Sequence, residues 1–457
     1  MADLNDFNYT DDVDDVLAIY VNRLLAATLR SEYKNVETLS ADKTLADSDT
    51  PIQRLNCNGA ARIVKMPTAD AEENHVFHIV NSGTGYTITV KSNDASITHA
   101  VLIQGTGVLM VPDGNGGYYA VGEKGAGSNL LINGGFNFWQ RITPTTATAM
   151  TDDVYNAPDR WYSLVQGAGA TINRNAGIGK SQYSAKLVAG GTTNRYGISQ
   201  IIEAENSIPL RGQTVLAQCR IKPVNNAGSG TRDYRIAILE WTGTADAVTS
   251  ELVADWTSGT FTTAGFFAST TKTLVGTAVV TATHDTETIL SVSGTVSASC
   301  NNLIVFIWTE DVPTHASDYA LIGETGLYAS GVLPVWKAEN VADEEARCLR
   351  YYENVPNVDQ GVIGFGQCYT TTAAFIYVEF TTKRAVPTLS VVNPTTDFYL
   401  SSAAGGNVAV TSFSATTRQA KNSALVFPNT ASGLVAGNAT MLYAQVSTAK
   451  ITVVSEL

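Results

Sequence analysis

Short runs in which apolar and polar residues alternate make up most of this 457-residue chain, and glycine-rich turns separate them. Residues 184–189 and 215–222 are runs of strand length. Residues 236–241 and 303–308 are almost wholly apolar. Such runs are typical of central strands that one sheet covers on one side and a neighbouring subunit or domain covers on the other. The pattern predicts an all-β, multidomain chain.

Apolar residues recur at helical spacing near the start of the chain. Val13, Leu17, Tyr20 and Leu24 fall on one face, and aspartates crowd the first turn, where they complement the helix dipole. We predict an N-terminal attachment helix within residues 1–35. Two interpretations stay open, since two to three heptads are marginal for oligomerisation. The helix forms a short trimeric coiled coil or docking peg, or it packs on the first β-domain.

Turn and linker signals divide the rest of the chain into domains. The glycine-rich stretch 122–128 (GEKGAGS) is typical of a linker. Before it, residues 36–121 predict a small β-barrel or β-sandwich domain. After it, residues 129–340 predict a β-sandwich of two sheets, and residues 341–457 predict a C-terminal β-sandwich domain that begins with a short connecting helix.

Composition narrows the functional classes. The formal net charge is −13 and the sequence pI is about 4.9, which disfavours nucleic acid held on a broad basic surface. Five cysteines without a CxxC pair indicate buried free thiols from a reducing compartment. We find no signal-peptide pattern and no apolar window of spanning length, so we predict no membrane insertion and assembly inside a cell.

The stretch 129–141 (NLLINGGFNFWQR) combines a predicted short strand, an Asn-Gly-Gly turn and large aromatics, and 157–162 (APDRWY) repeats the theme. Together they resemble the start of the jelly-roll, carbohydrate-binding-module-like domain of many bacteriophage tail-fibre and appendage proteins. Further matching segments are QIIE at 200–203, LRGQ at 210–213, ARCLRYYE at 346–353 and KRAVPT at 383–388. The resemblance extends from residue 129 onward.

This resemblance implies a virion structural protein, a tail fibre or appendage that is assembled in the host cytoplasm as a homotrimer. Its N-terminal helix would bind other virion proteins, and its jelly-roll domain would adhere to glycan on the host surface. The nearest alternative is a head fibre, or a decoration protein of the capsid or collar. The second alternative is a glycan-degrading depolymerase.

Glycan contact depends on aromatic rings, because the C–H faces of sugars pack on Trp and Tyr while polar side chains bind the hydroxyls. Trp139, Trp161 and Trp308 sit in apolar surroundings and are predicted to be core. The loop-placed candidates for binding are Asn194, Arg195, Tyr196, Trp241, Asp255 and Trp256. For these six, packing between loops or subunits remains the competing interpretation.

Catalytic patterns are not found in the sequence: there is no G-x-S-x-G elbow, H-E-x-x-H or P-loop. A depolymerase needs two carboxylates across a groove, and Asp152, Asp153 and Asp159 are the available candidates. Adjacent aspartates in a turn are more often solvated or part of a calcium clamp. His75 and His78 would point to opposite faces of a strand. We therefore predict a non-enzyme with no catalytic residue, no metal site and no cofactor.

Overall fold

The computed structural model describes residues 34–457, except 69–74, 84–85, 97, 103–104, 106, 113–116, 123–127, 157, 249–250, 259–260, 262–264, 268–270, 331–332, 335, 357–360, 393–396, 402–405 and 447–448. Val13, Leu17, Tyr20 and Leu24, which were predicted to form the attachment helix, lie outside the described residues. The range predicted to contain the helix, residues 1–35, overlaps the first described strand at its last two residues. Strand β1 (Lys34–Thr38) already begins there, because it pairs in parallel with β3 (Ile52–Asn56).

The described part of the chain is all-β, as predicted. Its helical elements are the short α2 (Ala204–Ser207), the 3-10 turn η3 (Ile208–Leu210) and α3 (Val341–Leu349). None of the described helices is long and apolar enough to cross a membrane. The contacts divide the chain into two compact units, the first comprising residues 1–128 with 214–216 and 328–335, and the second comprising the remainder.

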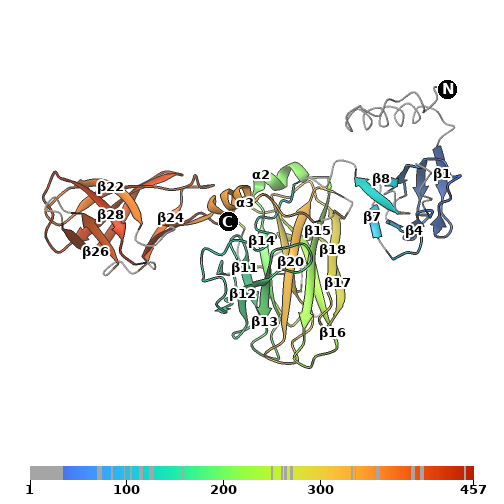
Figure 1. Ribbon diagram of the computed structural model, residues 1–457, viewed down its shortest axis with the longest axis horizontal. Helices are drawn as coiled ribbons and strands as arrows, with labels where there is room; N and C mark the ends of the chain where they lie inside the picture. Colours follow the sequence, from blue (N-terminus) through green and yellow to red (C-terminus); the bar gives the residue numbers. More distant parts are fainter. Residues whose placement is uncertain are drawn as a thin grey trace, which may run out of the picture. The chain divides into compact units, whose positions relative to one another are not determined.

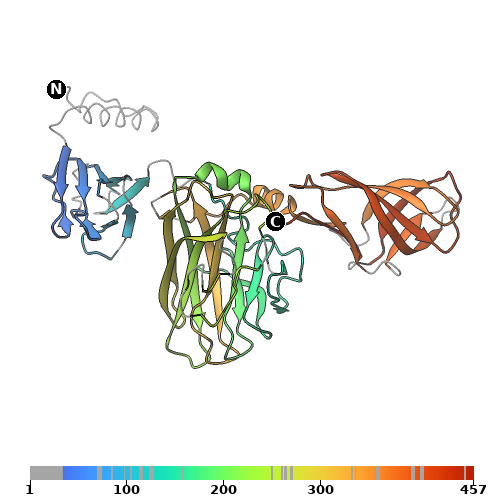
Figure 2. The same cartoon turned by 180° about the vertical axis from the view of Figure 1, so that it is seen from behind.

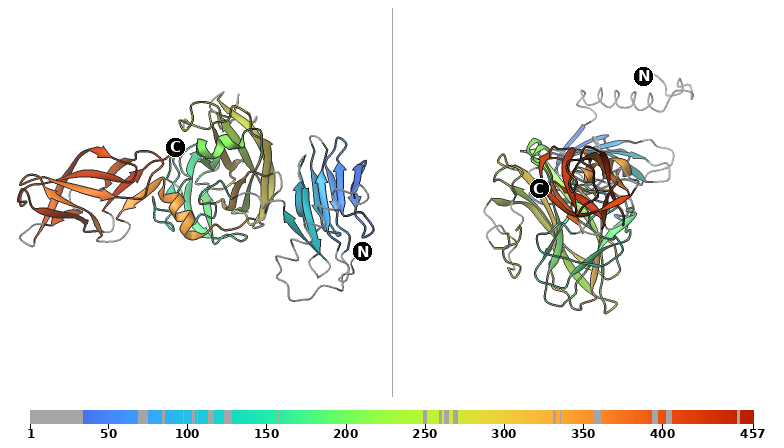
Figure 3. Two further views of the ribbon diagram at one scale, coloured as in Figure 1. Left: turned by 90° about the horizontal axis from the view of Figure 1, so that it is seen from above. Right: turned by 90° about the vertical axis from the view of Figure 1, so that its left-hand side faces the viewer.

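The first unit contains two sheets between which the chain alternates (Figure 3). One sheet has the order β1-β3-β5-β8-β9, with β5 (Phe77–Asn81), β8 (Gly107–Pro112) and β9 (Tyr118–Gly122). The other has the order β2-β4-β6-β7, with β2 (Lys43–Thr44), β4 (Arg62–Lys65), β6 (Ile88–Lys91) and β7 (Thr98–Leu102). The chain passes from one sheet to the other and returns to each sheet in the same direction. Strands β1, β3 and β5 therefore pair in parallel within the first sheet, and β2, β4 and β6 pair in parallel within the second.

The second unit begins with a β-sandwich (Figure 1 and Figure 2). The six-stranded sheet has the order β10 (Thr148–Ala149), β12 (Thr171–Ala176), β13 (Tyr183–Val188), β20 (Tyr319–Tyr328), β15 (Thr214–Val224) and β18 (Thr288–Thr295). The five-stranded sheet has the order β11 (Tyr162–Val165), β14 (Tyr196–Ile201), β19 (Asn302–Thr309), β16 (Thr231–Trp241) and β17 (Lys272–Thr283).

Strand β19 is buried along its whole length, as its apolar sequence predicts. Side chains alternate across a strand, so Leu303, Val305 and Ile307 face one side and Ile304, Phe306 and Trp308 face the other. The latter three belong to a cluster with Trp256, Phe266 and Phe267, which come from the segment between β16 and β17. The face of β19 that carries Phe306 and Trp308 is therefore covered by residues of the chain's own segment between β16 and β17. We had expected a neighbouring subunit or domain to cover it.

The last part of the chain contains a closed barrel where we expected a sandwich. Strand β22 (Val362–Cys368) pairs with both β23 (Ala374–Glu379) and β28 (Ala439–Ala444), which closes the ring. The ring is completed by β27 (Ser423–Thr430), β26 (Asn407–Gln419) and β25 (Phe398–Ser401), and it is seen end-on in Figure 3. A three-stranded sheet of β21 (Tyr352–Val355), β29 (Lys450–Val454) and β24 (Thr388–Val392) accompanies the barrel.

Candidate functional site

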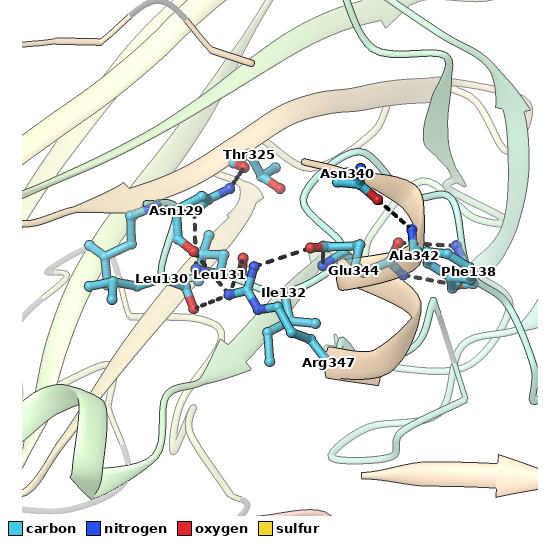
Figure 4. A network of polar contacts seen from close by, with 12 residues as sticks. Asn129, Leu130, Leu131, Ile132, Phe138, Thr325, Asn340, Ala342, Glu344 and Arg347 are labelled. Carbon is cyan, nitrogen blue, oxygen red and sulfur yellow. Dashed lines mark hydrogen bonds and ion pairs between the residues drawn. The ribbon is translucent and has the colours of Figure 1, made fainter. Parts of the chain in front are cut away.

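The opening segment 129–135 is held in an irregular conformation, and the strand predicted at residues 130–132 is absent. Asn129 donates its side-chain N–H to the carbonyl oxygen of Thr325 at 2.9 Å. Its Oδ1 accepts the backbone N–H groups of Leu131 and Leu327. One asparagine thereby satisfies backbone groups of its own turn and of β20, which anchors the segment on the sandwich (Figure 4).

Helix α3 binds the same segment from the other side (Figure 4). Asn340 caps the helix by accepting the N–H of Ala342 at 2.9 Å. Glu344 accepts the backbone N–H of Asn133, and Arg347 donates to the carbonyl oxygen of Asn129 at 2.9 Å. The conspicuous motif of the sequence is therefore a structural joint between the sandwich and α3.

Ion pairs, two of them largely buried, extend this joint toward the end of the chain. Glu456 pairs with Arg141 at 2.5 Å and with the fully buried Arg160. Arg350 pairs with Glu203 at 2.9 Å. A small cavity of about 120 Å³ is lined in part by Arg160, Glu203 and Arg350, which take part in these ion pairs. We interpret it as part of the joint.

A larger groove, of about 490 Å³, lies on the outer face of the six-stranded sheet. Val188 and Tyr319 are partners across β13 and β20, so their side chains share one face and form the floor with Val224. The Nζ atom of Lys186 lies 4.1 Å from the centroid of the Tyr319 ring. The rim is formed by Asn225, Asn226, Ala316 and Ser317, and all of these except Asn225 are exposed.

The rim loops are held by the buried Asp318. Its carboxylate pairs with Arg232 at 2.7 Å and accepts backbone N–H groups from Asn226 at 2.8 Å, Thr314 at 3.0 Å and His315 at 2.9 Å. Burial acts to raise the pKa of Asp318, but the hydrogen bonds from these backbone groups outweigh it and leave the pKa lowered. One ionised side chain therefore fixes both walls of the groove before any ligand arrives.

The lysine and arginine side chains on the outer face of the six-stranded sheet differ in whether they form ion pairs. Lys222 binds Asp285 at 2.8 Å, and Arg220 binds Glu324 at 2.7 Å. Lys186, in contrast, has no carboxylate within ion-pair distance in the part of the chain that the structure describes; its recorded contact is the Tyr319 ring. The groove therefore contains a positive charge with which no carboxylate of the described residues forms an ion pair.

The aromatic rings predicted to bind sugar are buried. Tyr196, Trp241 and Trp256 are 1%, 7% and 8% exposed, and both tryptophans belong to the core under the covering loop. Trp256 packs edge-on against Phe266 and Phe306. The expectation of loop-exposed rings at these positions was wrong, because the loop between β16 and β17 folds back onto the five-stranded sheet.

The polar residues predicted beside those rings support this packing. Arg195 donates to the carbonyl oxygens of Glu310, at 2.6 Å, and Trp256. Asp255 accepts the N–H and hydroxyl of Thr257 in its own turn. Asn194 donates to the carbonyl oxygen of Ala168 at 3.4 Å. The structure brings Arg195 and Trp256 together, but as parts of a loop anchor.

The barrel displays the most exposed aromatic residues of the described chain, a set that we call the aromatic face. Phe365, Tyr369 and Tyr377 are 66%, 62% and 48% exposed. Phe365 and Tyr377 are partners across β22 and β23, and Tyr369 packs on Phe375 with ring centroids 4.5 Å apart. The face lies on the outside of a closed barrel, and its two strands contain one charged residue, Glu379.

Two of the three carboxylates considered for a depolymerase accept hydrogen bonds from the fold. Asp152 accepts the N–H of Val165 at 2.8 Å, and Asp159 accepts two hydrogen bonds from Gln140. Burial, with a smaller effect of the neighbouring Asp152, raises the pKa of Asp153 to about 6. Among the residues that are described, no group of three or more His, Cys, Asp and Glu side chains could hold a metal ion. All five cysteines are buried and unpaired, as predicted.

No family model and no curated protein matches the chain. Solved structures that match include carbohydrate-binding modules. They include the CBM22-1 xylan-binding domain of Paenibacillus barcinonensis Xyn10C (14% identity, 43% of this chain and 100% of that one, TM-score 0.24) and TmCBM61 in complex with β-1,4-galactotriose (12%, 44% and 99%, TM-score 0.24). A two-module xylanase structure from Clostridium thermocellum (CBM22-1 with GH10) matches at 12% identity over 40% of this chain, with a TM-score of 0.24.

This chain spans 28% of that two-module structure. The similarity in all three cases is too low to support an argument about ligand or activity. The groove therefore has to be interpreted from its own residues.

Proposed function

We propose that this chain is a non-catalytic structural protein of a bacteriophage virion, a tail fibre or appendage that adheres to host-surface glycan through the groove on the six-stranded sheet. The observation that carries the proposal is the composition of the groove. A half-buried tyrosine ring forms its floor, an ammonium group lies over the ring, and an exposed amide and hydroxyl stand on its rim. The resemblance of the sequence to phage appendage proteins supports the virion role.

These groups match the chemistry of a sugar. A pyranose packs its C–H face on an aromatic ring, and its hydroxyls exchange hydrogen bonds with groups such as the side chains of Asn226 and Ser317. The volume of the groove, about 490 Å³, suits a short oligosaccharide. Because Asp318 already fixes both rim loops, binding costs little ordering of the protein.

The joint supports an appendage role, because an adhesin must hold its domains together while it is attached to a surface. Arg160 and Glu456 are both buried, and their separation would leave charges without partners. Breaking a buried ion pair of this kind lowers the free energy of unfolding by about 3–5 kcal/mol. The sandwich and the end of the chain therefore resist separation.

The homotrimer and attachment through residues 1–33 belong to the same proposal. Light scattering of the full chain tests the trimer, and a truncation that begins at residue 34 tests attachment. We expect the truncated chain to fold and to be absent from particles. Normal incorporation of the truncated chain would contradict the attachment role. Incorporation of the full chain into heads instead of tails would favour the head-fibre or decoration alternative.

Glycan adhesion is tested on an array of host-surface polysaccharides with the full chain. We expect Tyr319→Ala to abolish binding, whereas the matched variant Tyr377→Ala, which removes an outward-facing ring from the barrel, binds as the wild type does. Equal binding by Tyr319→Ala and the wild type would contradict the proposed site. Release of reducing ends from a bound polysaccharide would favour the depolymerase alternative.

A further inference from the structure

We infer that the groove selects glycans that contain an anionic sugar, and that Lys186 binds the negatively charged substituent. The inference rests on the proposed glycan-binding function and narrows it to a substrate class. It is carried by the pairing of charges on the outer face of the six-stranded sheet.

Each charged group recorded around the groove except Lys186 already has a partner of opposite charge. Arg220 and Lys222 are bound to Glu324 and Asp285. Asp318, the acid of the rim, is bound to Arg232 and to three backbone N–H groups. A ligand anion that enters the groove would meet the ammonium of Lys186 without displacing a protein carboxylate.

The position of Lys186 is set by the sheet. It lies on β13 opposite Leu321 of β20, two residues before Val188, so its stem emerges on the floor of the groove. The Nζ atom of Lys186 lies 4.1 Å from the centroid of the Tyr319 ring, and the ring attracts the ammonium through a cation–π contact. This contact orients the group and uses none of its three N–H donors in a hydrogen bond.

The same ring thus organises both parts of the site. One sugar would pack against Tyr319, and a carboxylate or sulfate on that sugar or its neighbour would reach Lys186. The chain as a whole has a net charge of −13, which repels polyanions in general. Binding of an anionic glycan would therefore depend on this local cation.

Calorimetric titration of the full chain with three trisaccharides tests the inference: galacturonic acid trisaccharide, a sulfated galactose trisaccharide and neutral galactose trisaccharide. We expect at least one anionic probe to bind about tenfold more tightly than the neutral one, and the ranking of the two identifies the anion. Lys186→Met should remove this preference, so that the variant binds the anionic and the neutral probes with equal affinity. Lys421→Met, an exposed lysine of the barrel, is the matched control and should keep the preference.

Equal affinity of the wild type for neutral and anionic probes, or an unchanged preference in Lys186→Met, would overturn the inference. A different result, obtained with Tyr319→Ala, would contradict the proposed glycan-binding function itself. If Tyr319→Ala binds every probe as the wild type does, the groove is not the glycan site. If Tyr319→Ala loses all binding while charge has no effect, the site stands and the anionic preference is refuted.

Discussion

The groove of the sandwich and the aromatic face of the barrel both present tyrosine rings on the outside of antiparallel strands. In the groove, Tyr319 is half buried between two loops that a buried ion pair holds in place. On the barrel, Tyr377 stands beside Phe365 on a convex surface, and both rings are largely exposed. The difference between the two regions is that a polar network fixes walls around the Tyr319 ring, whereas, among the described residues, no such walls surround the exposed rings of the barrel strands.

The two regions also differ in charge. The strands β22 and β23 contribute one charged residue to the barrel, whereas the outer face of the six-stranded sheet contains Lys186, Arg220 and Lys222. An exposed apolar surface marks an interaction site without specifying a small ligand. A charged, walled groove can discriminate between ligands, and the following predictions test this contrast.

The largest effect is expected when the support of the groove is removed. Asp318→Asn leaves Arg232 buried without its carboxylate, so we expect a loss of about 3–5 kcal/mol in the free energy of unfolding, together with loss of glycan binding. Urea denaturation and the glycan array measure these two quantities. Glu379→Gln on the barrel is the control and should change neither. A stable Asp318→Asn that still binds would show that the walls do not depend on this network.

The second prediction concerns how protonation of the Asp318 carboxylate changes stability and glycan affinity with pH. The folded-state pKa of Asp318 is lowered, so its contribution to stability is present above the unfolded-state pKa and is lost as the pH falls through the folded-state value. We expect glycan affinity and stability of the wild type to fall together below about pH 4, where a free aspartate begins to gain its proton. Asp318→Asn should lack this component. A parallel loss in the variant would assign the acid sensitivity to other groups.

Asp159 in the joint should respond in the opposite direction. Burial raises its pKa to about 6, so the folded state holds the proton more tightly than the unfolded chain does. Its contribution therefore weakens as the pH rises from about 4 to 6, by roughly 1.4 kcal/mol per pH unit at most. We expect the free energy of unfolding of Asp159→Asn to depend less steeply on pH in that window. Identical slopes for the variant and the wild type would contradict the assignment.

The smallest effect is expected on the aromatic face. The double variant Phe365→Ser with Tyr377→Ser removes two exposed rings, and we expect a change of less than about 0.5 kcal/mol in the free energy of unfolding and no change in glycan affinity. Analytical ultracentrifugation of this variant reports whether the face contributes to self-association. Loss of glycan binding would reverse the comparison and place the site on the barrel.

The sequence pattern predicted the strands of the sandwich well, because runs such as residues 184–189 and 303–308 alternate or are apolar throughout. It missed β1–β3, which are short and contain charged residues, and the parallel pairing of the first unit. Closure of the barrel was also missed. Pairing between distant strands, such as β22 with β28, leaves no local signal.

The rings predicted to bind sugar are buried, and the sequence pattern misled us about their exposure for a physical reason. Trp241 and Trp256 stand beside polar residues in the sequence, which is typical of an exposed loop, but the loop also contains Phe266 and Phe267 and forms a core layer with them. Lys186 and Tyr319 appeared as ordinary strand residues. The alternation of side chains along each strand predicts that Lys186 and Tyr319 face outward. The contact between these two side chains follows only from the pairing of β13 with β20, which the sequence does not show.

Hydrogen–deuterium exchange of the full chain, with and without a saturating host-surface glycan, tests the central claim most directly. The account predicts slower exchange in the presence of glycan at residues 186–188, 224–226 and 316–319, which surround the groove, and no change at residues 365–377. Protection confined to residues 365–377, with the groove unchanged, would contradict it.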